Sequence, residues 1–262
     1  MSPAIESHDP GAAPPRDDPG FWLGSGDLLD LEDPKLRLRA RSLTQLCKNE
    51  RERAMAVYGF VKRITFSKTF KLRLSTAREV MAAGHGDADD KATLLVALMR
   101  AADIPARLRY IELRGEILRG LTSGVASAAR PVAEMWLGGK WLRTDTYIFD
   151  AAYMAAARQR LKDQGWEWGY GIHRDGHAIW SGAGDAWLGG GPTSQDPMVL
   201  ADFGVFNDPK ELVRSEIWRA AHPRLARAVQ WNVLAPMMER VVRELRQEAS
   251  SGAPAPAPRR IS

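Results

Sequence analysis

The sequence of 262 residues has a single cysteine, Cys47, and no long run of hydrophobic residues. One cysteine excludes an intramolecular disulfide, which is typical of a protein from a reducing compartment. The longest wholly apolar stretches, such as Leu94 to Met99, fall far short of the roughly 18 residues that a membrane-spanning helix needs. The first 20 residues lack the basic start and the apolar segment of a secretion signal. We therefore expect a cytoplasmic protein with no membrane partner.

Basic residues only slightly outnumber acidic ones, because the sequence has 37 lysines and arginines and 32 aspartates and glutamates, which give a formal net charge of +5. The basic side chains are spread along segments with helical periodicity and are mixed with acidic ones, which is typical of a solvated helix face. No zinc-finger, RNP or helix-turn-helix motif accompanies them. The hydrophobic fraction of 45% is that of a globular protein, so the composition favours a folded domain with no nucleic-acid partner.

Half of the 16 prolines lie in the two ends of the chain. Segments of this composition bury too little apolar surface to fold, so we expect disordered tails over residues 1–20 and 250–262. No internal repeat divides the remainder of the chain. Residues 21–249 are therefore predicted to form a single domain.

Hydrophobic periodicity predicts an early group of helices, then strands, then a second group of helices. The expected helices are 33–47, 49–64, 75–83 and 87–102, followed by 150–164, 209–220 and 223–248. Cys47 falls inside the first of them and is expected to be a buried structural residue. The expected strands are 106–113, 132–137 and 141–146, the last two joined by a hairpin turn at Gly138 and Gly139.

Residues 165–206 have no sustained periodicity, and nine glycines fall between Gly165 and Gly191. A loop of this length in a compact domain is typically a lid or a binding loop. The same stretch contains tryptophans, which argue against disorder. We expect Trp166, Trp168 and Trp180 either to form an aromatic wall for a ligand or to hold an irregular loop in place.

Two sequence segments carry a family resemblance. AAGHGDADDKATLLVALMRAADIPARLRY, followed by PVAEMWLGGKWLRTDT, resembles the core of the transglutaminase-like superfamily, whose architecture is related to that of the papain-like cysteine proteases. The resemblance covers residues 75–150 and rests on the phrase LMRAADIPAR, the E-x-W-L-G-G-x-W hairpin and the W-x-x-x-D spacing. It implies an α+β fold with a transglutaminase-like (papain-like) core, in which a site helix packs on an antiparallel sheet and extra helices lie at both ends.

The resemblance also implies where a catalytic triad would lie. In the family, a cysteine opens the site helix, a histidine comes four residues before a strand glutamate, and an aspartate comes four residues after a strand tryptophan. These positions are Ala88, Arg130 and Asp145 in this sequence. Alanine has no sulfur to deprotonate, and a guanidinium stays protonated at physiological pH. We therefore predict that the unmodified chain has no cysteine-dependent transglutaminase or protease activity.

Arg130 and Asp145 are still the leading candidates for a site, because the resemblance places both at the former catalytic cleft. They either form a structural salt bridge or hold a carboxylate or phosphate through the bidentate guanidinium. The second interpretation predicts a ligand with an acidic group.

Other titratable residues could supply a replacement acid or base. His85 lies three residues before Ala88, while His173 and His177 belong to the glycine-rich loop and could reach the cleft if the loop folds over it. An exposed loop histidine is the alternative interpretation for each. Tyr147 is a candidate proton donor and ligand-binding residue.

Metal and cofactor chemistry is not predicted. Three aspartates at the start of the site helix resemble an acidic cluster, but a helix N-terminus favours an N-cap and acids in the first turn, so Asp87, Asp89 and Asp90 are interpreted as capping residues. No metal site and no cofactor are expected.

Three functional interpretations follow. The first is a pseudoenzyme, a transglutaminase-like domain that has lost catalysis and binds a peptide, a protein or an anionic small molecule in the old cleft. The alternative is a cysteine-independent lyase or hydrolase that uses Asp145, Arg130 and a relocated histidine. The third is a cysteine enzyme presented as a Cys→Ala variant at Ala88.

Overall fold

The computed structural model describes residues 15–192, 194–222 and 224–251, with the side chains of 224–233 and 249–251 left out. Most of the two predicted tails therefore lies outside the described residues. Residues 15–20, which were expected to belong to the first tail, are instead part of the fold. Asp18 caps a short 3-10 helix, η1 (Pro19–Leu23), and this helix buries Trp22.

The centre of the fold is a four-stranded antiparallel sheet in the order β5-β4-β3-β8. Its strands are β3 (Ala106–Arg114), β4 (Ser127–Leu137), β5 (Lys140–Thr144) and β8 (Val199–Phe206). Gly138 and Gly139 have φ values of 58° and 79°, so they close the β4–β5 hairpin with the primed turn that was predicted. Trp136 lies opposite Trp141, with ring centroids 5.5 Å apart.

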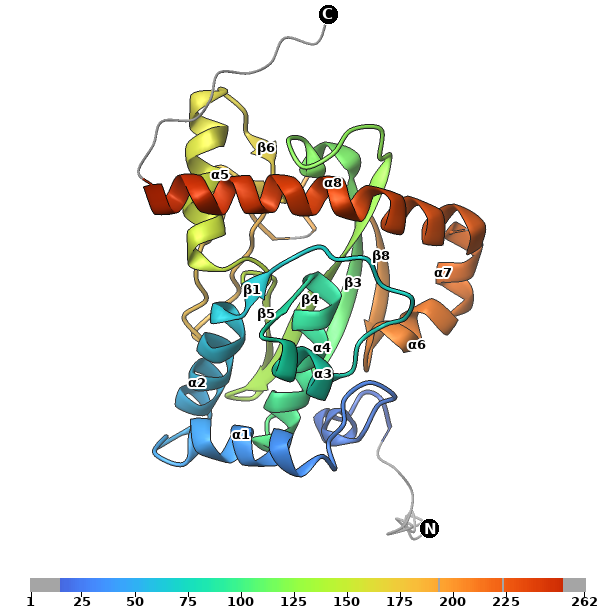
Figure 1. Cartoon of the computed structure of the whole chain (residues 1–262). Coiled ribbons are helices and arrows are strands. Elements are labelled where there is room, and N and C mark those ends of the chain that lie inside the picture. Colours follow the sequence, from blue (N-terminus) through green and yellow to red (C-terminus); the bar gives the residue numbers. More distant parts are fainter. Residues whose placement is uncertain (1–14, 193, 223, 252–262) are drawn as a thin grey trace, which may run out of the picture.

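The site helix α4 (Ala88–Ala101) packs against this sheet, as expected (Figure 1). Around it lie α1 (Pro34–Thr44), α2 (Glu50–Arg63) and α3 (Ala77–Ala83). Spacing of four and three residues puts Ala92, Leu95 and Met99 on one face of α4, and all three are fully buried. The antiparallel α+β architecture predicted from the sequence is therefore confirmed.

The C-terminal part adds α5 (Ala151–Asp163), α6 (Pro209–Arg214), α7 (Glu216–Ala221) and α8 (Arg224–Ser251). One helix was predicted over 209–220, but Ser215 takes an extended conformation and divides it. The Ser215 side chain accepts a hydrogen bond from the Trp218 N–H and so caps α7. Helix α8 crosses the front of the molecule, over the sheet and beside α5 (Figure 1).

The stretch 165–206 is more regular than the sequence predicted. It contains the short strands β6 (Trp168–Gly169) and β7 (Ile172–His173), and it ends in β8, which pairs with β3. Gly204 has φ 89° and the β3–β8 register shifts twice, so β8 lacks the clean alternation that would have revealed it. A parallel pair of two-residue strands, β1 (Thr65–Phe66) and β2 (His85–Gly86), lies beside α4.

Cys47 is also placed differently from the prediction. Helix α1 ends at Thr44, and Cys47 lies in the connection to α2, where it is half-buried. Its thiol is 3.7 Å from the Leu43 carbonyl oxygen.

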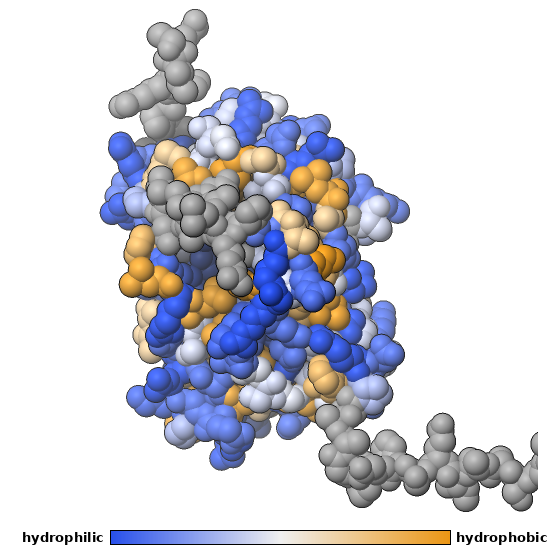
Figure 2. Space-filling view, turned by 90° about the vertical axis from the view of Figure 1, so that its right-hand side faces the viewer, coloured by the Kyte–Doolittle hydropathy of each residue, from blue (hydrophilic) through white to orange (hydrophobic). Residues whose placement is uncertain are grey.

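The surface is mainly hydrophilic on the face seen in Figure 2, where hydrophobic side chains form separate patches. No helix among the described residues is both long and apolar enough to cross a membrane.

Candidate functional site

The N-terminus of α4 is held by a capping box. The Asp87 carboxylate accepts a hydrogen bond from the Asp90 N–H, and Asp90 accepts one from the Asp87 N–H in return. Lys68 and Lys71 pair with Asp87 at 2.8 and 3.0 Å. The predicted capping role is confirmed for Asp87 and Asp90, whereas the Asp89 side chain accepts a hydrogen bond from Tyr110 instead. The two lysines hold the pKa of Asp87 well below its usual range against the opposing effect of burial.

Arg130 and Asp145 form a buried ion pair. Arg130 is in β4, Asp145 follows β5, and the two side chains are 8% and 2% exposed. Arg130 Nη1 lies 3.1 Å from Asp145 Oδ2, and Nη2 donates to the Gly171 carbonyl oxygen. The other Asp145 oxygen accepts from the Leu188 N–H at 2.7 Å. Burial raises the pKa of Asp145, while the charge of Arg130 opposes that rise.

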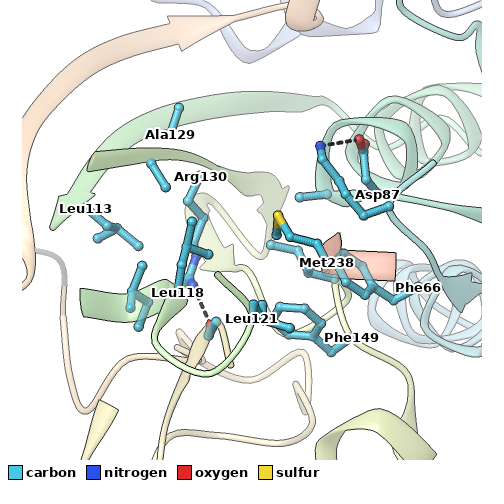
Figure 3. Close-up of a pocket in the computed structure, with 15 residues that line it drawn as sticks. Phe66, Asp87, Leu113, Leu118, Leu121, Ala129, Arg130, Phe149 and Met238 are labelled. Atoms are coloured by element: carbon cyan, nitrogen blue, oxygen red, sulfur yellow. Dashed lines mark hydrogen bonds and ion pairs between the residues drawn. The ribbon is translucent and has the colours of Figure 1, made fainter. Parts of the chain in front are cut away.

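A pocket of about 70 Å³ lies between these two groups. Ala88 and Arg130, at the two positions where the family has cysteine and histidine, both line it. Its other walls are mostly apolar and come from six parts of the chain: Phe66, Leu113, Ile117, Leu118, Leu121, Ala128, Ala129, Ile148, Phe149, Gly171 and Met238, with Lys68 and Asp87 at one end. Figure 3 shows Met238 between Arg130 and Asp87.

Helix α8 supplies Met238, so the C-terminal helix forms one wall of the pocket. Three polar contacts anchor it there. The Glu239 carboxylate accepts a 2.7 Å hydrogen bond from the Lys68 N–H, Arg246 pairs with Asp150, and Arg160 of α5 pairs with Glu248. Only the structure reveals this wall, because α8 follows α4 by more than 100 residues and no local pattern marks its packing partner.

Residues 37–146 match the family model of the transglutaminase-like superfamily. The chain carries a transglutaminase-like domain. The matched segment starts within α1, well before the motif resemblance at residue 75, and it includes Ala88, Arg130 and Asp145.

Among solved structures, a crystal structure described as a "Putative Cysteine Protease" from Cytophaga hutchinsonii is similar to part of the chain. The two are 21% identical with a TM-score of 0.39, and the match covers 50% of this chain and 40% of that one. None of the curated proteins matches the chain.

The histidines of the transglutaminase-like domain and its glycine-rich loop have partners other than Asp145. His85 is exposed, and its Nδ1 lies 2.9 Å from Ser67 Oγ. His173 Nδ1 accepts from the Asp175 N–H, and His177 Nδ1 accepts from the Trp187 N–H. Within the described residues, no histidine side chain is hydrogen-bonded to Asp145. The loop does reach the aspartate, but through the backbone of Leu188.

The candidate binding residues of the loop do not line the pocket. Trp180 is fully buried and donates to the Gly184 carbonyl oxygen, while Trp166 stacks on Tyr170 and has the Arg119 guanidinium 3.5 Å from its ring centroid. Trp168 meets the ring of His173 edge-on. These contacts hold the loop together, which is the second of the two interpretations given above.

Tyr147 is likewise fully buried and does not line the pocket. Its hydroxyl donates to the Pro131 carbonyl oxygen at 2.9 Å. Burial raises the pKa of Tyr147 well above its usual range, so the phenol keeps its proton. The hydroxyl of Tyr147 is therefore hydrogen-bonded to the backbone of β4 and not directed to a ligand in the pocket.

Asp89 follows Ala88 in the first turn of α4. Tyr110 of β3 donates its hydroxyl to Asp89 Oδ1 at 2.9 Å. Burial raises the pKa of Asp89 to about 6, and the neighbouring Asp87 carboxylate adds to the rise against the charges of Lys68 and Lys71. Because the folded chain binds this proton more tightly than the unfolded chain, Asp89 destabilises the fold increasingly as the pH rises from about 4 to about 6.

Asp89→Asn is therefore expected to stabilise the chain above about pH 7, by about 1–3 kcal/mol, because it removes a half-buried charge and keeps an acceptor for Tyr110. Urea denaturation at about pH 4 and about pH 7.5 measures the effect, which should nearly disappear at the lower pH. Asp175→Asn, at an exposed loop carboxylate, is the control. Equal gains at both pH values would show that Asp89 ionises normally.

Within the part of the chain that the structure describes, no group of three or more His, Cys, Asp or Glu side chains is placed to hold a metal ion.

Proposed function

We propose that this transglutaminase-like domain is a pseudoenzyme that binds a small ligand in the former catalytic cleft. One observation carries the proposal. The residues at the nucleophile and base positions, Ala88 and Arg130, face the same pocket, and neither has the group that thiol chemistry requires.

Arg130 cannot stand in for the histidine base. Its guanidinium stays protonated, and Nη1 and Nη2 already donate to Asp145 and Gly171. Cys47 does not replace the missing nucleophile, because it lies between α1 and α2 and its thiol is close to the Leu43 carbonyl oxygen. These contacts support the loss of cysteine-dependent acyl transfer.

The cleft nevertheless keeps the features of a binding site. It is a preformed pocket with apolar walls and a charged guanidinium, a combination that gives a ligand both affinity and orientation. The cysteine-independent enzyme would need a base beside Asp145, and the hydrogen bonds of the candidate histidines lead elsewhere. Binding is therefore the function that the geometry favours.

A thiol introduced into the pocket tests this proposal. In a Cys47→Ala background, Ala88→Cys places a reporter on the pocket wall, and its alkylation by iodoacetamide is followed by mass spectrometry. We expect some members of a panel of small carboxylates, amides and short peptides to slow alkylation at least about fivefold, because a bound ligand covers the wall at position 88.

The matched control is the unsubstituted chain, in which alkylation of Cys47, remote from the pocket lining, should not respond to the same compounds. If no member of the panel slows the reporter, the proposed binding function is wrong.

A further inference from the structure

The pocket has a cationic side chain at one end and a paired lysine and aspartate at the other. Arg130 lines the pocket, but its partner Asp145 does not, so the guanidinium lies between that carboxylate and the pocket. Two of the five N–H donors of Arg130 have partners among the described residues, at Asp145 and Gly171. The remaining donors can serve a ligand. At the other end of the pocket, Lys68 already neutralises Asp87 at 2.8 Å. A carboxylate would therefore bind at the Arg130 end.

The walls beyond Arg130 suit an aliphatic chain. They are formed by alanine, leucine, isoleucine and phenylalanine side chains from β4, from the η2 region (Gly115–Leu118) and from the segment after β5. A carbon chain extending from Arg130 would meet these groups and few polar atoms. Burying each methylene in such surroundings contributes about 0.8 kcal/mol to binding.

The size of the pocket limits the chain. At about 10–15 Å³ for each water-sized group, its volume of about 70 Å³ holds about five to seven non-hydrogen atoms, the size of a carboxylate of three to five carbons. Met238 of α8 forms one wall of the pocket and is only 4% exposed. Because Glu239, Arg246 and Glu248 anchor the same helix, a peptide could enter only if α8 were displaced.

We infer that the ligand of the cleft is a short aliphatic carboxylate of about three to five carbons, with its carboxylate on Arg130 and its chain against Met238. This inference rests on the proposed binding function and specifies the class of ligand. It makes Arg130 the residue that selects charge and Met238 the residue that selects chain length.

A titration series tests both selections. Acetate, butyrate, octanoate and the neutral butyramide are added to the full chain, and the methyl signal of Met238 is followed by nuclear magnetic resonance. We expect the Kd of butyrate to be at least about tenfold lower than that of acetate, octanoate or butyramide. A tenfold difference in Kd corresponds to about 1.4 kcal/mol of binding free energy.

Met238→Ala removes the wall that limits the chain and should move the preference from butyrate toward octanoate, by about tenfold in the ratio of their Kd values measured calorimetrically. Met237→Ala is the matched control, because Met237 is the next residue of α8, is 44% exposed and does not line the pocket. It should leave the ratio unchanged.

Arg130→Met should abolish the preference for butyrate over butyramide. Because this change leaves Asp145 buried without its partner, Arg130→Met/Asp145→Leu provides a second variant in which no charge is stranded. Loss of the preference is expected in both, and its retention in the folded double variant would overturn the role of Arg130.

The failure of this inference and that of the proposed function are distinguishable. If butyramide, octanoate or a peptide binds as tightly as butyrate, or if only such compounds protect the thiol introduced at position 88, the short-carboxylate inference is overturned while the binding function stands. If no compound protects that thiol or shifts the Met238 signal, both are overturned.

Discussion

Asp145→Ala is expected to lower the free energy of unfolding by about 3–5 kcal/mol, a large part of the stability of a single domain. The substitution leaves the Arg130 guanidinium, 8% exposed, without its counter-charge and removes the acceptor of the Leu188 N–H. The anchor between the β4–β5 hairpin and the glycine-rich loop is lost at the same time. Urea denaturation at neutral pH measures the change.

Two comparisons show whether that loss comes from a stranded charge. Arg130→Met/Asp145→Leu removes both charges and should recover more than half of the stability lost in Asp145→Ala. Asp175→Ala, which breaks an exposed pair with Arg174, should cost less than about 0.5 kcal/mol. A loss below about 1 kcal/mol in Asp145→Ala would mean that the pair contributes little to the fold.

Ala88→Cys/Arg130→His is expected to have a more reactive thiol than Ala88→Cys alone. The first change puts a thiol at the start of α4, and the second puts an imidazole beside Asp145, which is already held by the Leu188 N–H. General-base assistance typically contributes about 100-fold or more, so we expect the double variant to be acylated about 100-fold faster by para-nitrophenyl acetate near neutral pH.

Both variants are compared in a Cys47→Ala background, with Arg130→His alone as the control for changes at position 130. The first turnover, seen as release of para-nitrophenolate, gives the rate. Equal rates for Ala88→Cys with and without Arg130→His would show that position 130 is not placed to act as a base. The premise that these residues occupy a degenerate triad would then fail.

Local signals in the sequence predicted the parts of the fold that local interactions determine. Asp87 before an apolar-periodic segment located the start of α4, and Gly138-Gly139 between two alternating segments located the hairpin. The resemblance to the transglutaminase-like superfamily predicted that Arg130 and Asp145 lie at one cleft, and their side chains are 3.1 Å apart in the structure. For the start of α4 and for the hairpin, the residues that determine the structure lie within a few positions of each other in the sequence.

The rest depends on packing between distant segments. Met238 lines the same pocket as Ala88 and Arg130 only because α8 folds back over the cleft, and the helical pattern of α8 does not indicate which surface it packs against. The loop tryptophans could have faced a ligand or the loop itself, and Trp180 is buried against Tyr58 because the loop folds onto α2. Strand β8 escaped prediction because its irregular register with β3 breaks the alternation.

We propose that the cleft of this transglutaminase-like domain binds its ligand without cysteine chemistry. The most direct test is steady-state release of para-nitrophenolate from para-nitrophenyl acetate by the unsubstituted chain, before and after treatment with iodoacetamide, beside Cys47→Ala. We expect all three rates to equal the rate given by an unrelated protein at the same concentration, with no acyl group on any residue that lines the pocket. Turnover by the unsubstituted chain that iodoacetamide or Cys47→Ala abolishes would contradict it.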